Sequence, residues 1–225
     1  MRPEPTPKEI RLVAHITIDI FEKYGFSCCL FGSLACHIYG MKHRDPGDVD
    51  LVVLNHKNLD TEDLKELLCD DDDNFYLVDS KRAHADYRVL WYKVPARRSG
   101  VLPKPCKVDI LITGMKKSLN VPWVRQVESY KLPVMPLLPL LYMELSGWHG
   151  HRFSPEFRKR RKVRRDIKDI KELLKIATDE WDLHRTNKDQ KMAQWYMNDM
   201  AKQVRKFIKK VPDTQERWET LGFWC

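Results

Sequence analysis

The chain has 225 residues and carries 40 lysines and arginines against 32 aspartates and glutamates, which gives a formal net charge of +8 at pH 7. This length suffices for one large domain or two small ones with a real core, and the charge favours polyanionic partners such as nucleotides or RNA. No apolar run approaches the roughly 20 residues of a membrane span, and the N-terminus, rich in proline and charge, does not resemble a signal peptide. We therefore expect a cytoplasmic or nuclear protein without a membrane partner.

The cysteines, histidines and glycines exclude several classes of site. The six cysteines show no Cys-x-x-Cys spacing, and no pair of the eight histidines has the ligand spacing of a zinc site on a helix. The sequence contains no Gly-rich Walker or Rossmann loop. Four cysteines lie in or beside expected core segments, which is typical of buried thiols in a reducing compartment.

The N-terminal part alternates between helical and strand-like patterns. Apolar residues at helical spacing predict a first helix with Gly25 as its C-cap. The sequence then predicts strands and helices in this order: helix 8–24, strand 26–31, helix 34–39, strand 48–53, helix 61–69, and strands 75–78, 87–94 and 108–112. Helices between the first strands, followed by a run of strands, predict a mixed α/β sheet and not a doubly wound one.

Two short polar motifs interrupt these apolar elements. Gly32 and Ser33 directly follow the first predicted strand, where backbone N–H groups and a hydroxyl are available to a phosphate. Asp48 and Asp50 open the next strand and share one of its faces, because side chains alternate along a strand. Two such carboxylates can hold Mg²⁺ together with substrate phosphates. The two motifs therefore predict a site for a metal-bound nucleoside triphosphate.

These motifs resemble the signature of the DNA polymerase β-like nucleotidyltransferase superfamily over roughly residues 8–115. The signature is a Gly-Ser pair, about a dozen residues, and a carboxylate-x-carboxylate on a strand. Arg44 resembles the basic residue that often precedes the pair. The superfamily uses a third carboxylate on a later strand, and Asp109 is the only carboxylate in a strand-like apolar run after the first pair. The alternative for Asp109 is an ordinary strand carboxylate paired with Lys107 or an arginine.

The resemblance implies an enzyme and assigns roles to its residues. Asp48, Asp50 and Asp109 would be the catalytic residues and would bind two Mg²⁺ ions, or Mn²⁺ in their place. Gly32, Ser33 and Arg44 would bind the nucleotide, an NTP such as ATP. The enzyme would transfer a nucleoside monophosphate to a hydroxyl acceptor, a small molecule or RNA, and release pyrophosphate.

Arg88 is a further candidate for nucleotide binding. It alternates with its neighbours in the strand 87–94, so its guanidinium can point toward a triphosphate from that strand. A salt bridge at the edge of the sheet is the alternative for this side chain.

The remainder of the chain is helical. Apolar stripes predict helices at 134–148, 158–176 and 189–209 and an aromatic tail at 218–225 that docks against the body. We therefore expect a nucleotidyltransferase-like domain at 1–120, a helical domain at 121–225, and the site in the cleft between them. This part resembles less specifically the helical companion of minimal nucleotidyltransferases, with Glu144 where many of those have a lysine.

The run 158–165 is the densest positive charge in the chain. It is consistent with an RNA or phosphate patch, with a nuclear import signal or with a solvated helix end. Two functions other than catalysis stay open for the whole chain. One is a degenerate module that binds nucleotide or RNA without turnover, and the other is an antitoxin-like interaction protein on the same fold.

Overall fold

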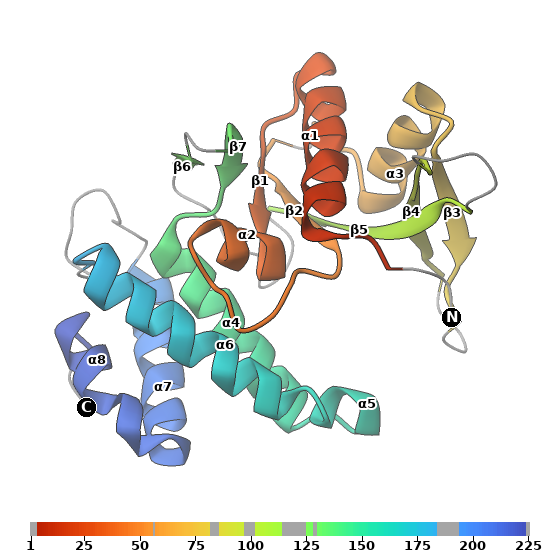
Figure 1. The fold of residues 1–225 in the computed structure, drawn as a ribbon. Helices are drawn as coiled ribbons and strands as arrows, with labels where there is room; N and C mark the ends of the chain where they lie inside the picture. The colour runs from red at the N-terminus through yellow and green to blue at the C-terminus, as the bar shows by residue number, and fades with distance from the viewer. Residues whose placement is uncertain are drawn as a thin grey trace. The chain divides into compact units, whose positions relative to one another are not determined.

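The computed structural model describes residues 4–55, 57–81, 86–96, 102–113, 125–127, 130–183 and 194–223. The chain forms two compact units (Figure 1). The first comprises Met1–Ile38 and Arg44–Met135, and the second comprises Tyr39–His43 and Pro136–Cys225. Within the described residues, no helix has both the length and the apolar character needed to cross a bilayer.

The described strands of the first unit form one seven-stranded mixed sheet in the order β3–β4–β5–β2–β1–β7–β6. The strands are β1 (Cys28–Phe31), β2 (Val49–Val53), β3 (Phe75–Asp79), β4 (Arg88–Val94), β5 (Lys104–Ile112), β6 (Arg125–Val127) and β7 (Leu132–Val134). The pairs β2–β5 and β1–β7 are parallel, and the other pairs are antiparallel. The predicted mixed sheet is confirmed, with β6 and β7 as additions that the sequence pattern did not indicate.

The helices in the described part of this unit are α1 (Pro7–Lys23), α2 (Gly32–Ile38) and α3 (Thr61–Asp71). The apolar stripe of α1, including Ile10, Val13 and Phe21, is fully buried. Helices α1 and α3 contact each other and the central strands, and both lie over the sheet in Figure 1. Apolar side chains at helical spacing thus produce one face of the core, as the sequence predicts.

A capping box begins α1 and also connects this helix to the sheet. The carboxylate of Glu9 accepts hydrogen bonds from the backbone N–H and the hydroxyl of Thr6, at 2.7 and 2.9 Å. The ammonium group of Lys104 in β5 donates to the same carboxylate at 2.9 Å. These bonds, foremost the one from the Thr6 backbone, lower the pKa of Glu9 from 4.5 to about 2.

Replacing Glu9 with glutamine should lower the free energy of unfolding by about 2 kcal/mol at neutral pH, since the depressed pKa favours the charged form in the folded state. The contribution is complete above the unfolded pKa of 4.5 and is lost as the pH falls through the folded pKa of about 2. Urea unfolding at neutral pH and at about pH 3 should show the difference shrinking. The exposed Glu4→Gln is the charge-matched control, and an effect of Glu9→Gln that does not depend on pH would contradict this account.

The second unit is helical in its described part. Its elements are α4 (Leu137–Arg152), α5 (Phe157–Arg160), α6 (Val163–Lys175), the π-helical turn η1 (Ile176–Glu180), α7 (Gln194–Lys210), the 3₁₀ turn η3 (Pro212–Thr214) and α8 (Gln215–Thr220). Helix α4 contacts α5, α6 and α7. Its Pro139 lies in the first turn, where backbone N–H groups have no acceptor within the helix, so the proline costs no helical hydrogen bond.

These elements differ from the predicted helices at their ends. The predicted helix 158–176 is divided into α5 and α6, with a turn at residues 161–162, and it continues into η1. Of the predicted helix 189–209, residues 189–193 lie outside the described residues. The predicted docking of the aromatic tail is confirmed for its described part. Trp218 is fully buried and lies edge-to-face against Phe207 of α7, with ring centroids 6.3 Å apart.

The predicted boundary near residue 120 differs from the division that the contacts define. Strand β7 pairs with β1, so the chain belongs to the sheet as far as Met135. The short segment Tyr39–His43 belongs with the helices instead. The backbone N–H groups of Lys42 and His43 donate to the Glu172 carboxylate at 2.7 and 3.3 Å.

The imidazole of His43 adds two contacts to this junction with α6. Its Nε2 lies 2.6 Å from Oδ1 of Asp169, which is buried, and its Nδ1 contacts Glu172. Although burial alone would raise the pKa of Glu172, the hydrogen bonds from Lys42 and His43 hold it below its usual value. We refer to Tyr39–His43, held to α6 in this way, as the α6 strap.

Candidate functional site

Strand β1 passes directly into α2 at a glycine. Strand β1 ends at Phe31 and α2 begins at Gly32, whose backbone has a φ of +62°. A Cβ atom built at this position would lie 2.2 Å from Oδ2 of Asp50. Two features therefore favour glycine at this position: the left-handed backbone conformation and the close approach of the Asp50 carboxylate.

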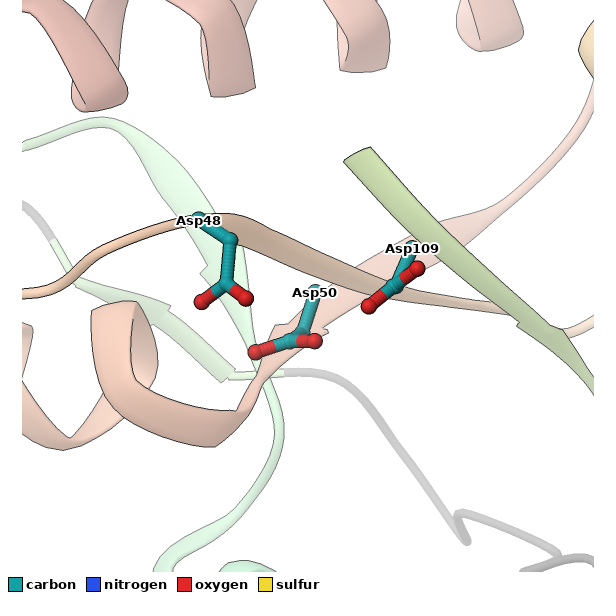
Figure 2. Close-up of side chains that lie close together, drawn as sticks. All are labelled: Asp48, Asp50 and Asp109. Atoms are coloured by element: carbon teal, nitrogen blue, oxygen red, sulfur yellow. The ribbon is translucent and has the colours of Figure 1, made fainter. Parts of the chain in front are cut away.

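Three aspartates converge beside this turn. Asp48 directly precedes β2, Asp50 lies in β2, and Asp109 lies in β5. In the parallel ladder between β2 and β5, Asp50 is the register partner of Asp109. Each residue offers a carboxylate oxygen, and the three oxygens lie within 4.8 Å of one another. Figure 2 shows the three side chains lying close together.

The pattern of burial along β2 and β5 explains why the carboxylates share one face. Val108 and Ile110 of β5 are buried, and Asp109 between them is half-buried on the other face. In β2 the buried Val49 and Leu51 flank Asp50 in the same way. Because side chains alternate along a strand, an acidic residue between two core residues must point away from the core. Two parallel strands in this register then place their carboxylates side by side.

A lysine and a serine contact the carboxylates of the triad. The ammonium group of Lys107 forms an ion pair with the Asp109 carboxylate. The hydroxyl of Ser33 donates to Oδ1 of Asp48 at 3.5 Å, a long hydrogen bond. Three carboxylates so close together repel one another, and a bound cation would relieve the repulsion. Asp109 thus forms the ion pair with Lys107 that was its predicted alternative, and it also belongs to the triad.

The donor atoms of the triad suit a hard divalent cation. All three residues offer carboxylate oxygens, which Mg²⁺ and Mn²⁺ prefer. Cys106 of β5 is buried with Val108 and Ile110 on the face opposite to Asp109, so its thiol is not among the donors of the triad. The residues present therefore fit Mg²⁺ better than a thiophilic metal such as zinc.

The structure places the other predicted site residues as follows. Arg44 is half-buried and precedes β2 in the loop that leads to Asp48. Arg88 begins β4, and its guanidinium donates to Glu62 at 3.1 Å and to Glu66 at 2.5 Å, both on α3. A salt bridge, the alternative for Arg88, is thus observed, but its partners are on α3 and β4 lies between β3 and β5 and not at the edge of the sheet. We leave Arg88 out of the proposed nucleotide site.

One feature of the site escaped the sequence analysis. The sequence indicates that Gly32 permits a sharp turn, but not that the Asp50 carboxylate lies against it. Strand pairing could have suggested this contact, because Phe31 is the register partner of Asp50 in the antiparallel ladder between β1 and β2. A prediction of that register from sequence would have placed the Gly-Ser turn beside the carboxylate pair.

Comparisons with known proteins agree with this geometry at the level of the fold. No protein-family model matches the chain, and neither does any curated protein. The crystal structure of an antigenic nucleotidyltransferase-like protein from Paracoccidioides brasiliensis matches with a TM-score of 0.68 at 15% identity, over 97% of this chain and 95% of that chain. The predicted nucleotidyltransferase-like fold, a mixed sheet followed by helices, is therefore confirmed.

A second solved structure is more distant. It is ANT(2″)-Ia in complex with adenylyl-2″-tobramycin, with a TM-score of 0.40 at 8% identity, over 75% of this chain and 94% of that chain. This likeness is too weak to support an argument. The comparisons thus establish the fold of the chain, and its chemistry has to be argued from the site itself.

Proposed function

We propose that the chain is a Mg²⁺-dependent nucleotidyltransferase that transfers a nucleoside monophosphate from an NTP to a hydroxyl acceptor. The observation that carries this proposal is the convergence of Asp48, Asp50 and Asp109, with oxygens within 4.8 Å of one another, beside the Gly32 turn. The fold shared with a nucleotidyltransferase-like protein supports it. The intact set of three carboxylates favours an active enzyme over a degenerate module.

The three carboxylates would hold the metal, and their oxygen donors and mutual repulsion fit that role. Bound divalent ions would neutralise phosphate charge and acidify the acceptor hydroxyl. We propose two ions, the number that the resemblance to the nucleotidyltransferase superfamily implies. Asp109 lies on a different strand from the other two carboxylates and would take the proton of the acceptor hydroxyl.

The Gly-Ser turn would bind the terminal phosphates of the nucleotide. The backbone N–H groups of Gly32 and Ser33 and the Ser33 hydroxyl are the donors. The long hydrogen bond from Ser33 to Asp48 can be exchanged for one to a phosphate oxygen at little cost. Arg44, four residues before Asp48 in the chain, is proposed to contribute positive charge to the nucleotide.

The transfer itself is an in-line displacement. The acceptor oxygen attacks the α-phosphorus and forms a new phosphoester bond, while the bond from the α-phosphorus to the bridging oxygen breaks. Pyrophosphate leaves with that oxygen, and the acceptor proton passes to the carboxylate. The role of the protein is to orient the two reactants and to stabilise the charge that develops on the leaving oxygen.

Calorimetric titration of the parent protein with each of the four NTPs tests the proposal. We expect binding with a Kd between about 1 μM and 1 mM that requires Mg²⁺ and disappears when the metal is chelated. Inorganic triphosphate serves as the control, because attraction by the net positive charge alone would bind it equally well. Incubation with α-labelled NTP and candidate acceptors should then release unlabelled pyrophosphate. Absence of binding for all four NTPs in Mg²⁺ would contradict the proposal and favour the interaction-protein alternative.

A further inference from the structure

A basic pocket lies on the second unit, where the chain passes from α5 to α6. Arg158, Arg161, Lys162 and Arg165 line a pocket of about 290 Å³. Arg158 lies in α5, Arg161 and Lys162 form the turn, and Arg165 lies in the first turn of α6. All four are exposed, so their charged groups reach solvent on the same surface. The pocket belongs to the run 158–165 that the sequence analysis left open.

Among the described residues none of these four cations forms an ion pair with a carboxylate, although the charge of Arg165 acts on the buried carboxylate of Asp166. Of the three other basic side chains of the run, Lys159 and Arg160 are engaged locally, and Arg164 is exposed. Lys159 forms an ion pair with Glu156 at 2.9 Å, and the guanidinium of Arg160 donates to the backbone carbonyls of Ser154 and Pro155 at 2.8 and 2.7 Å. Four like charges around one pocket repel one another, so an anion bound among them is favoured by electrostatics.

Two carboxylates of α6 have partners inside the unit. Asp166 is buried, and its carboxylate lies 2.7 Å from Nδ1 of His151. Asp169 is also buried, in contact with the imidazole of His43. Asp166 and Asp169 are therefore buried with histidine partners, whereas the four basic side chains that line the pocket are exposed.

Two exposed aromatic rings adjoin the pocket along the chain. Phe153 and Phe157 are each 66% exposed, although phenylalanine is usually buried. The guanidinium of Arg152 lies 5.1 Å from the ring centroid of Phe153, and that of Arg160 lies 5.8 Å from the ring centroid of Phe157. Exposed rings and exposed cations in one short segment are the combination that binds single-stranded nucleic acids, in which bases stack on the rings and the phosphates contact the cations.

We propose that Phe153, Phe157, Arg158, Arg161, Lys162 and Arg165 form a binding surface for single-stranded nucleic acid, here called the basic–aromatic surface. The phosphates bind in the pocket and the bases stack on the two rings. A duplex fits less well because its base faces are already covered by stacking. A lipid bilayer also fits less well, because the apolar stripe of α6, with Ile170, Leu173 and Leu174, is buried inside the unit and unavailable for insertion. This inference does not depend on the proposed catalytic function.

Fluorescence anisotropy with a labelled oligo(U) of about 16 nucleotides tests the electrostatic half of the proposal. The logarithm of the association constant should fall linearly with the logarithm of salt concentration between about 50 and 200 mM. In the variant R158Q/R161Q/K162Q/R165Q this slope should become shallower by about 2–3, because each lost phosphate contact on a single strand contributes about 0.7. Affinity at the lowest salt concentration should fall by about tenfold or more.

A matched control separates this surface from the general positive charge of the protein. The variant K202Q/R205Q/K209Q/K210Q removes the same number of charges from exposed positions of α7. We expect its affinity and salt slope to stay near those of the parent. Equal losses in both variants would overturn the proposal, since they would show attraction by net charge alone. Thermal unfolding checks that the variants are folded, and the single substitution Arg161→Gln replaces the fourfold variant if that one is not.

The stacking half of the proposal has its own test. The variant F153A/F157A should lose about fivefold or more in affinity per ring, with the salt slope unchanged, because stacking releases no counterions. The same measurements with oligo(dT), with an RNA duplex and with phosphatidylserine vesicles compare the classes of ligand. Preference for single strands over the duplex supports the proposal. Tighter binding of the duplex, or binding of vesicles without binding of either oligonucleotide, would overturn it.

Discussion

Replacing Asp48 and Asp50 together with asparagine should reduce nucleotidyl transfer by about 10³-fold or more, because the substitution removes two of the three charges that would hold the metal. Asparagine has almost the same shape as aspartate, so the sheet should form as in the parent protein. Loss of like charges that lie within 4.8 Å of each other should leave thermal stability unchanged or raise it. Initial rates with α-labelled NTP, calorimetric titration with Mg²⁺–NTP and thermal unfolding measure the three quantities.

The control for this variant removes the same charge elsewhere in the first unit. Asp45 and Asp73 are exposed, and neither belongs to the triad. The variant D45N/D73N should keep the transfer rate and the NTP affinity of the parent protein. If D48N/D50N kept a rate within about tenfold of the parent, the triad would not be the catalytic centre.

Replacing Gly32 with alanine should both destabilise the protein and damage the site. A non-glycine residue at a φ of +62° costs about 1–3 kcal/mol. In addition, the new Cβ would lie 2.2 Å from Oδ2 of Asp50, so this carboxylate must move. We expect the free energy of unfolding to fall by at least the backbone cost and Mg²⁺-dependent NTP binding to be lost. Urea unfolding and calorimetric titration of the same preparation measure the two effects.

Gly47 provides the matched control for this substitution. It lies in the chain segment that precedes β2, and a Cβ atom built there meets nothing within 4 Å. Alanine at this position should leave the free energy of unfolding unchanged or raise it by up to about 1 kcal/mol. A Gly32→Ala protein that bound NTP with the affinity of the parent would show that the position of Asp50 beside the turn is not required.

Much of the sheet could be predicted because its central strands have an unambiguous pattern. In β5, the buried Cys106, Val108 and Ile110 alternate with partly exposed residues, and this period of two leaves little choice of face. The same alternation identifies Asp50 and Asp109 as carboxylates that point away from the core. The pairing of β2 with β5 could not be read from either strand alone, because register depends on the partner. The resemblance to a known signature supplied that link.

Other features could not be predicted because they depend on contacts between segments far apart in the sequence. Strands β6 and β7 have three residues each, too few to show an alternating pattern. Arg88 has the same local sequence whether it faces a phosphate or the carboxylates of α3, and only the packing of that helix decides between them. The local sequence likewise predicts His43 only as a loop residue, because its contact with Asp169 depends on the folded structure.

Because the second unit includes the α6 strap, cleaving the chain once cannot release this unit whole. Lys42 and His43 precede Asp48 in the chain by only a few residues, yet their partners Asp169 and Glu172 come more than a hundred positions later. A fragment that ends at Met135 therefore contains the backbone N–H groups of Lys42 and His43 but not the Glu172 carboxylate that accepts their hydrogen bonds. Any chimaera that exchanges the helices must import matching carboxylates as well. The second unit is therefore complete only when the chain on both sides of the sheet is present, because the strap and α6 come from segments separated by the first unit.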